Sequence, residues 1–355
     1  MRSLEESLVG CILGTAVGDA LGLPCEALSK RRQRRMFPQT DRYHFVFGRG
    51  MTSDDTEHTC LVAQALIVSG GDAAAFTKSL AWRLRWWLLG LPANIGMATL
   101  RAGVKLWLGF GGSRSGVFSA GNGPAMRSAV IGASFGSDLK QMCQLVRSAT
   151  RITHTDPKAE FGALAVALAA SLSSRRPACD VSADGFLDQL TQLIGADGKE
   201  FLDLIRRVIE SAAAGQTTEA FAAELGLEKG VSGYVYHTVP VSLHAWFAHQ
   251  ADFSSAVTEV IRCGGDADTT AAIVGGLVGA RTGKAGIPQA WLDGLWEWPR
   301  TVAWMESLAA RLTSVSTDRT PQPELKLFVP GVFLRNILFL LVVLAHGFRR
   351  MLPPY

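Results

Sequence analysis

Two acidic segments, about 210 residues apart, carry the residue types best suited to chemistry in this sequence. The first, at residues 52–56, is TSDDT, and the second, at residues 264–270, is GGDADTT. Each has two carboxylates with hydroxyl groups beside them. Oxygen donors of this kind prefer hard cations such as magnesium, manganese or calcium to zinc. Four carboxylates are enough to hold two divalent ions.

The same residues have a second interpretation, because Ser, Thr and Asp before an apolar helix are common N-caps. A cap explains one oxygen per helix and leaves the second carboxylate of each segment unexplained in an apolar neighbourhood. Buried charge needs a partner, and the only basic residues beside the two segments are Arg49 and Arg262. We therefore favour a binuclear site for hard cations, with capping as the alternative.

Other places in the chain have residues suited to a ligand. Glu26 follows a glycine-striped helical segment, where its carboxylate would face the metals or a water, or else be a surface acid. Residues 111–127 are rich in glycine and lead into a predicted helix, where backbone N–H groups can bind phosphate. His154 and His237 each lie beside a predicted helix start. For both histidines, a structural role is the alternative to ligand contact.

Helices must position these groups, because apolar residues recur at spacings of three and four and convincing strand patterns are absent. We predict an all-α, compact, orthogonal multi-helix domain over residues 1–313. Its helices are expected at residues 4–24, 56–69, 73–90, 94–107, 125–134, 136–150, 157–173, 183–194, 198–213, 216–225, 236–249, 251–262, 269–282 and 287–312.

The first of these helices has glycines at positions 10, 14, 18 and 22, a spacing of four that leaves one helical face without side chains. Each glycine inside a helix costs about 0.5–1 kcal/mol relative to alanine. A row of four therefore indicates tight packing of another backbone against this face, near a central site.

Composition narrows the protein class. The chain has 355 residues, 48% of them hydrophobic, and a formal net charge of +4, too small a bias to identify a nucleic-acid-binding protein. Six scattered cysteines, without a C-x-x-C pair, predict reduced thiols. Two glutamates near the amino terminus occupy the place where a secretory signal has basic residues, so we expect a cytoplasmic protein.

The carboxyl-terminal part differs in composition from the rest. Residues 314–326 are polar with two prolines and predict a linker, and residues 327–355 form an apolar tail. Arg335 and Asn336 interrupt the tail, leaving nine unbroken apolar residues at 337–345, too short a run to cross a bilayer comfortably. We expect the tail to lie at a membrane surface, dock on a partner or pack on its own domain.

A run of five cations within residues 30–35 follows Glu26 closely in the chain. Near the mouth of the predicted cleft, such a run could steer an acidic partner. The alternative is a solvated surface segment, which is the usual role of a charge run.

Taken in order, the motifs resemble those of the ADP-ribosylglycohydrolase family. The resemblance rests on GxxxGDALGxPxE at residues 14–26 and SDDT at 53–56. It continues through GNGPAMR at 121–127, THxDP at 153–157, GYVxHT at 233–238 and GGDADT at 264–269. The matched region spans residues 10–282, roughly three quarters of the chain.

The resemblance implies a compact all-α fold with two magnesium ions, for which manganese could substitute, at the base of a cleft. It assigns the metal ligands to Ser53, Asp54, Asp55, Asp266, Asp268 and Thr269. Catalytic roles would fall to Glu26, Asp55 and Asp268. Substrate binding would fall to Ser119, Gly121, Asn122, Gly123, His154 and Tyr234.

The implied activity is hydrolysis of the glycosidic bond between ADP-ribose and an acceptor. Arginine is the preferred acceptor, by similarity to the nitrogenase-regulating members. The expected partner is an ADP-ribosylated protein or a small-molecule conjugate of ADP-ribose, without sequence-specific nucleic acid, and the chain is expected to be a monomer. Two alternatives remain: an inert ADP-ribose-binding or crystallin-like protein, and a two-metal nucleotide phosphohydrolase.

Overall fold

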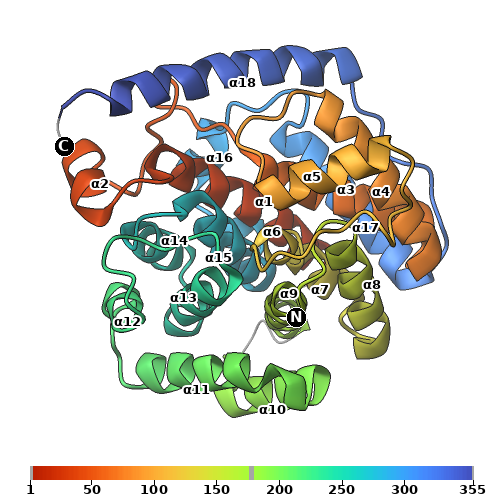
Figure 1. Ribbon diagram of the computed structural model, residues 1–355, viewed down its shortest axis with the longest axis horizontal. Coiled ribbons are helices and arrows are strands. Elements are labelled where there is room, and N and C mark those ends of the chain that lie inside the picture. Colours follow the sequence, from red (N-terminus) through yellow and green to blue (C-terminus); the bar gives the residue numbers. More distant parts are fainter. Residues whose placement is uncertain (1–2, 176–179, 354–355) are drawn as a thin grey trace.

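The computed structural model describes residues 3–175 and 180–353, which form eighteen α-helices and three short 3-10 helices without a β-strand (Figure 1). The all-α prediction is confirmed. The elements are α1 (Leu4–Gly22), η1 (Leu23–Cys25), α2 (Lys30–Met36), α3 (Asp54–Ser69), α4 (Ala73–Leu89), α5 (Met97–Trp107), α6 (Gly123–Met126), α7 (Ala129–Phe135), α8 (Leu139–Arg151), α9 (Pro157–Arg175), α10 (Ala183–Ile194), η2 (Ala196–Gly198), α11 (Lys199–Ala213), α12 (Thr218–Glu224), α13 (Val235–Ala248), α14 (Phe253–Arg262), α15 (Ala267–Thr282), η3 (Lys284–Gly286), α16 (Gln289–Gly294), α17 (Val302–Asp318) and α18 (Val329–Arg350).

Helices α1 and α15 run side by side through the centre of the molecule (Figure 1). The glycine face of α1 lies directly on the backbone of α15, as the sequence predicts. A methyl group added at any of the four glycines would lie 2.0–2.3 Å from a carbonyl oxygen of α15. The pairs follow an antiparallel order: Gly10 with Gly279, Gly14 with Gly275, Gly18 with Ala271 and Gly22 with Ala267.

This antiparallel contact places the carboxyl end of α1 beside the amino end of α15. The chain after α1 is held there by two backbone hydrogen bonds, from Ala27 N to Gly265 O (2.7 Å) and from Gly265 N to Leu28 O (2.9 Å). Gly264 and Gly265 have φ angles of +68° and +77°, in the left-handed region that favours glycine. The second acidic segment therefore lies beside Glu26.

The structure divides two of the predicted helices and moves the start of the predicted linker. The predicted helix 125–134 is two helices, α6 and α7, separated at Arg127 and Ser128. The predicted helix 287–312 is also two, α16 and α17. The predicted linker at 314–326 begins five residues too early, because α17 continues to Asp318, where Val315 and Ser316 extend its buried face.

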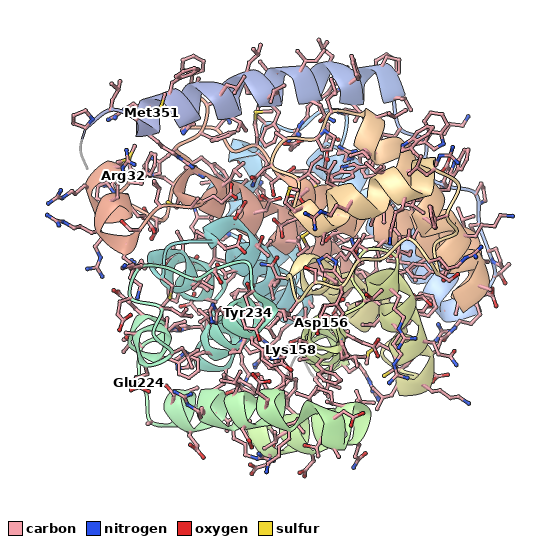
Figure 2. The ribbon with its side chains drawn as sticks, viewed as in Figure 1. Arg32, Asp156, Lys158, Glu224, Tyr234 and Met351 are labelled. Carbon is pink, nitrogen blue, oxygen red and sulfur yellow. The ribbon has the colours of Figure 1, made fainter. Side chains whose placement is uncertain are left out.

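The basic run at residues 30–35 forms helix α2. Ser29 Oγ accepts a hydrogen bond from Arg32 N at 3.4 Å, and Gln33 Nε2 donates to Ile261 O at 2.9 Å, which attaches the helix to the end of α14. In Figure 2, Arg32 lies at the same end of the molecule as Met351, which follows α18. The run is thus an ordered surface helix.

Residues after α17 lie along the domain. Gln64 of α3 holds Leu325 through two hydrogen bonds, one to its N–H and one to its carbonyl oxygen. Helix α18 then crosses one edge of the molecule (Figure 1). By length and composition, both α1 and α18 could cross a membrane, but α1 is almost entirely buried in the protein, whereas most of α18 is exposed.

Among the described cysteines, the predicted free thiols are confirmed: Cys11, Cys25, Cys60, Cys143 and Cys263 are buried and unpaired. Burial raises the pKa of Cys11 to about 12, so this thiol stays protonated. The sixth, Cys179, lies outside the described residues.

The α1–α15 contact predicts an unusual response to Gly14→Ala. In an isolated helix this change would stabilise by about 0.5–1 kcal/mol. Here the added methyl group would meet Gly275 O at 2.1 Å, so we expect a loss of about 3 kcal/mol or more in the free energy of unfolding. Urea denaturation measures it. Gly111→Ala, where no atom lies within 4 Å, is the control, and equal stability of the two variants would contradict the contact.

Candidate active site

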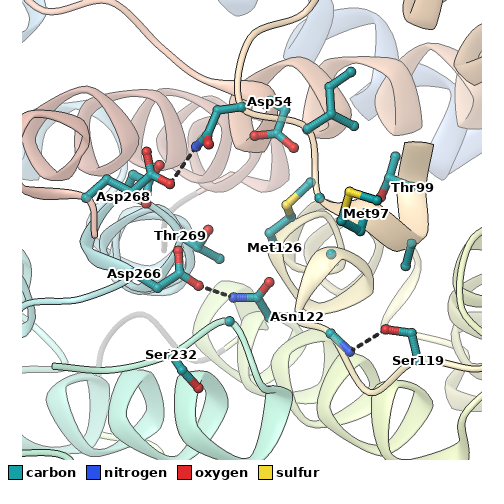
Figure 3. A pocket seen from close by; sticks show the side chains of 18 of the residues that line it. Asp54, Met97, Thr99, Ser119, Asn122, Met126, Ser232, Asp266, Asp268 and Thr269 are labelled. Atoms are coloured by element: carbon teal, nitrogen blue, oxygen red, sulfur yellow. Dashed lines mark hydrogen bonds between the residues drawn. The ribbon is translucent and has the colours of Figure 1, made fainter. Parts of the chain in front are cut away.

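A cavity of about 500 Å³ lies where the start of α3, the start of α15 and the segment after α1 meet (Figure 3). Its other walls come from residues 94–99, 119–123 and 231–233. Five of the predicted metal-binding and catalytic residues line it: Glu26, Asp54, Asp266, Asp268 and Thr269.

The two remaining predicted ligands, Ser53 and Asp55, lie behind this wall. Thr269 Oγ1 donates a hydrogen bond of 3.2 Å to Asp55 Oδ2, joining residues 214 positions apart. Ser53 Oγ donates to the same oxygen at 3.0 Å. The fold therefore brings the two acidic segments together into one site.

Helix capping accounts for part of the first segment only. Ser53 is the N-cap of α3, and its Oγ accepts a hydrogen bond from Asp55 N at 3.3 Å. Asp266 occupies the N-cap position of α15, but its side chain makes no capping bond. Instead Asp266 Oδ2 accepts from Asn122 Nδ2 at 2.5 Å. Capping thus explains Ser53 and none of the four aspartates.

The clustered carboxylates disfavour one another's charged form. Burial raises the pKa of Asp54 well above its ordinary value, and the nearby charges of Asp19 and Glu26 raise it further. Burial raises the pKa of Asp268 in the same way, followed by the charges of Glu26 and Asp266. A positive charge in this cavity would favour the ionised form of both Asp54 and Asp268 and lower their pKa values.

The donor set fits hard divalent cations. The buried oxygens Asp55 Oδ1 and Asp268 Oδ1 have no hydrogen-bond partner, although buried carboxylates normally have one. Within residues 3–175 and 180–353, no three carboxylate, imidazole or thiolate groups converge on one point. Magnesium usually retains several waters and takes one or two carboxylates from the protein, so the paired aspartates and adjacent hydroxyls suit it.

Asp19 of α1 is a site residue that the sequence analysis did not single out. It is fully buried beneath the first acidic segment. Its carboxylate accepts from Ser53 N at 2.9 and 3.0 Å, from Thr56 N at 3.2 Å and from Thr56 Oγ1 at 2.6 Å. Burial raises its pKa to about 7. The available signal was an acid inside an otherwise apolar, glycine-striped helix.

Positive charge behind the site comes from Arg127, the last residue of the GNGPAMR motif, to which the sequence analysis gave no role of its own. Arg127 is fully buried behind the cavity, where Nη1 bonds His58 Nδ1 at 3.0 Å and Nη2 donates to Ala149 O at 2.9 Å. Burial lowers the pKa of Arg127 to about 10, and the charge of Asp54 opposes this shift. Arg127 therefore remains a cation at neutral pH.

The glycine-rich segment forms the opposite wall of the cavity. Gly121, Asn122 and Gly123 line it, and a methyl group added at Gly121 would lie 2.9 Å from His154 Nε2. Asn122 N donates to Gly233 O at 3.0 Å. Its side chain binds Asp266 as described above and Thr238 Oγ1 at 2.9 Å. Asn122 thus connects this wall to the second acidic segment.

His154 lines the cavity in its neutral form, because burial lowers its pKa to about 3. Ser119 also lines the cavity, and its Oγ accepts from Gly121 N at 3.3 Å (Figure 3). The Tyr234 side chain instead contacts Lys158, with its hydroxyl 3.1 Å from Lys158 Nζ (Figure 2). Of the predicted substrate-binding residues, Tyr234 is the one that does not line the cavity.

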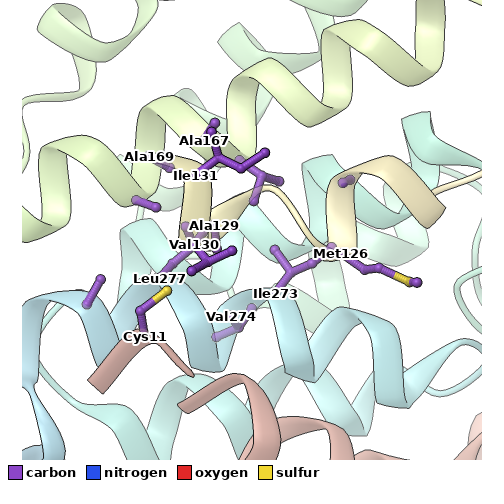
Figure 4. Packing of buried hydrophobic residues seen from close by; sticks show 14 of the residues in the cluster. Cys11, Met126, Ala129, Val130, Ile131, Ala167, Ala169, Ile273, Val274 and Leu277 are labelled. Carbon is purple, nitrogen blue, oxygen red and sulfur yellow. The ribbon is translucent and has the colours of Figure 1, made fainter. Parts of the chain in front are cut away.

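Residues 94–99 form a wall that the sequence analysis missed. Asn94 has a φ angle of +65° and its Nδ2 donates to Glu26 Oε1 at 2.6 Å. Met97 and Thr99 face the cavity across from the aspartates (Figure 3). Met126 also lines the cavity and belongs to the main hydrophobic core, whose packing Figure 4 shows. The site therefore rests directly on the core.

Helix α18 binds Thr52, the first residue of the first acidic segment. Arg335 Nη2 donates to Thr52 O at 2.6 Å, while Glu297 Oε1 accepts from Thr52 N at 2.7 Å. Arg335 and Glu297 form a buried ion pair. The ion pair thus binds both the carbonyl oxygen and the N–H group of Thr52.

A second buried pair adjoins the first. Arg300 Nη1 lies 2.7 Å from Glu57 Oε1, and Arg335 Nη1 lies 3.9 Å from the same oxygen. Burial alone would raise the pKa of Glu57, but the charges of Arg300 and Arg335 lower it overall. The four side chains therefore form one ionic network behind the acidic site.

This chain matches known proteins in sequence and in structure. A family model described as ADP-ribosylglycohydrolase matches residues 1–322. An uncharacterized protein of Archaeoglobus fulgidus is 32% identical, over 87% of this chain and 96% of its own length. An ADP-ribosyl-[dinitrogen reductase] glycohydrolase of Rhodospirillum rubrum is 28% identical, over 82% of this chain and 91% of its own.

Two further matches extend this picture. An ADP-ribosylarginine hydrolase of Pseudomonas putida is 26% identical, over 89% of this chain and 79% of its own length. A solved structure described as an ADP-ribosylglycohydrolase-related protein complex is 29% identical with a TM-score of 0.66, covering 89% of this chain and all of its own. The family match ends at residue 322, so α18 and its Arg335 lie beyond it.

The ionic network predicts that Arg335→Met destabilises the protein. Loss of the arginine leaves Glu297 buried without its counter-charge, which costs about 3–5 kcal/mol. The free energy of unfolding in urea measures this. Arg349→Met, on the exposed side of the same helix, should change it by less than about 0.5 kcal/mol. Adding Glu297→Gln to Arg335→Met should recover part of the loss; no recovery would contradict the pairing.

Proposed function

Because this chain belongs to the ADP-ribosylglycohydrolase family, we propose that it hydrolyses the glycosidic bond between ADP-ribose and an acceptor, and so reverses ADP-ribosylation. The observation that carries the proposal is the contact between Thr269 and Asp55, which joins the two acidic segments at one cavity. Its volume of about 500 Å³ lies within the range of roughly 300–1,000 Å³ that is usual for ligand sites.

The cofactor in this proposal is a pair of Mg²⁺ ions, with Mn²⁺ as a substitute. When bound, they would supply positive charge that offsets the carboxylates and orients ribose hydroxyls and a water. Unpartnered carboxylate oxygens and raised aspartate pKa values support this assignment. The residues proposed to hold the ions are Ser53, Asp54, Asp55, Asp266, Asp268 and Thr269.

Glu26 is our candidate for the proton acceptor. Of the three acids considered for catalysis, Glu26 and Asp268 line the cavity, whereas Asp55 lies behind it. Asn94 fixes one oxygen of Glu26 at 2.6 Å and so orients the carboxylate. Burial, followed by the charge of Asp266, raises the Glu26 pKa. A carboxylate with a raised pKa is a better proton acceptor near neutral pH.

The opposite wall is proposed to bind the ADP-ribose moiety. Gly121 and Gly123 leave the backbone accessible beside His154, whose neutral ring can both donate and accept a hydrogen bond. Ser119 adds a hydroxyl to the same wall. Tyr234 joins this wall through its backbone alone, because its side chain lies against Lys158.

Arginine is our proposed acceptor. Support comes from the P. putida relative, whose name specifies ADP-ribosylarginine. The test is to incubate the protein and Mg²⁺ with ADP-ribosyl-arginine, ADP-ribosyl-serine and O-acetyl-ADP-ribose and to measure free ADP-ribose. Release from the arginine conjugate above the others supports the proposal. Binding without release would indicate an inert module, and formation of AMP or phosphate would indicate a phosphohydrolase.

The acidic site predicts opposite effects of Asp54→Asn or Asp268→Asn on activity and on stability. Turnover should be abolished, because a ligand for the cations is lost. The metal-free protein should be at least as stable as the wild type, because the change relieves repulsion among buried carboxylates. Steady-state assays and thermal unfolding in EDTA measure these effects.

Added Mg²⁺ provides the matching control. It should stabilise the wild type by about 2.7 kcal/mol when present at roughly 100 times its dissociation constant. Asp54→Asn and Asp268→Asn should lose this gain, and Asp188→Asn, at an exposed aspartate of α10, should keep it. Retained turnover in either site variant would refute the assignment.

A separate prediction concerns Glu26→Gln. We expect kcat to fall by about 10²–10⁴-fold, the usual contribution of a proton-transfer group, while Mg²⁺ still stabilises the protein. A proton acceptor must be ionised, so wild-type activity should decline as the pH falls through the raised Glu26 pKa. That acidic limb should be absent from the pH–rate profile of the variant. An unchanged profile would exclude Glu26 as the acceptor.

A further inference from the structure

Helix α18 is amphipathic with its apolar face turned outward. Leu334, Leu341 and Phe348 have relative exposures of 63%, 59% and 64%. The exposed positions recur at helical spacing and carry only apolar side chains from Phe333 to Phe348. The large members of this outer face are Phe333, Leu334, Ile337, Leu338, Leu340, Leu341, Leu344 and Phe348. A contiguous apolar face of this kind marks an interaction surface.

Four of the five polar residues of α18 bind the domain, and the fifth, Arg349, is exposed near the end of the helix. Arg335 belongs to the ionic network described above, and Asn336 Nδ2 donates to Gly90 O at 2.7 Å. His346 Nε2 bonds Phe45 O at 2.8 Å, and Arg350 Nη2 donates to Pro24 O at 3.0 Å. These bonds fix which side of the helix faces outward. They also oppose insertion of α18 across a bilayer, which would leave buried charges of the domain unpaired.

Exposed aromatic side chains extend the apolar surface at the amino end of α18. Trp82, Trp86 and Leu89 of α4 line a groove of about 520 Å³ together with Val329 and Phe333. The two tryptophans are about half exposed. Tryptophan is enriched at the boundary between lipid headgroups and acyl chains. The two exposed tryptophans therefore suit contact with the surface of a lipid bilayer.

Arginines lie at the opposite, carboxyl end of α18. Arg349 is exposed there, and Arg32 of α2 donates to Leu352 O at 3.5 Å, which places α2 beside this end (Figure 2). Residues 325–355 contain no aspartate or glutamate, so a second copy of this helix would offer no opposite charge to these cations.

We propose that the outer face of α18 docks in the plane of an anionic lipid bilayer. The apolar side chains would enter the boundary between headgroups and acyl chains, and Arg349 would contact anionic headgroups. The helix stays attached to the domain through its polar inner face.

The test uses the full-length protein and vesicles of phosphatidylcholine alone or in an equal mixture with phosphatidylglycerol. Cosedimentation should show binding to the anionic vesicles, weaker binding to the neutral ones, and a decrease with added salt. Leu341→Glu/Leu344→Glu should weaken binding roughly tenfold or more, because two charges replace exposed apolar groups in the lipid contact. Circular dichroism and thermal unfolding verify that this variant folds.

A matched control adds the same two charges elsewhere. Gln192→Glu/Ala213→Glu places them at exposed positions of α10 and α11, at the edge of the molecule opposite α18 (Figure 1), and should reduce anionic-vesicle binding only slightly. Arg349→Gln should remove part of the preference for anionic vesicles while leaving binding to neutral ones unchanged.

Three outcomes would overturn the proposal. The first is no vesicle binding by the wild type. The second is equal loss of binding in the α18 variant and in the α10/α11 control. The third is a wild-type dimer, by light scattering without lipid, that Leu341→Glu/Leu344→Glu converts to a monomer, because the outer face would then be an interface between copies of the chain.

Discussion

The contact between the backbones of α1 and α15 is the constraint on which the rest of the structure depends. Four glycines on α1 meet carbonyl groups of α15 at distances that no larger residue permits. Because the helices are antiparallel, this contact brings the end of α1 to the start of α15. Asp19, Glu26 and the second acidic segment gather there, and the first segment joins them through Asp19 and Thr269.

The gathered acids repel one another, and the acids behind the site are treated differently from those in the cavity. Behind the site, arginines pair with the acids outside the cavity, as Arg335 does with Glu297 and Arg300 with Glu57. Within the cavity, Asp54, Asp266 and Asp268 have no arginine partner among the described ion pairs, and their pKa values are raised. This uncompensated negative charge is the feature that supports the proposed pair of divalent cations.

Helix α18 combines two roles on its two faces. Its inner face supplies Arg335, which binds Thr52, the first residue of the first acidic segment. Its outer face presents only apolar side chains from Phe333 to Phe348. The family match ends at residue 322, so α18 lies outside the matched region. It couples the proposed lipid contact directly to the segment that positions the aspartates.

The sequence by itself determined the helical class, the close-packed glycine face and the two acidic segments, because helical periodicity and residue chemistry are local properties. The site residues Asp19, Asn94 and Arg335 required the tertiary structure, because each acts through contacts with residues remote in the chain. For the same reason, the sequence alone does not decide whether α18 contacts a membrane, a partner or its own domain. Most of its residues are apolar, and only packing shows which side of the helix is outward.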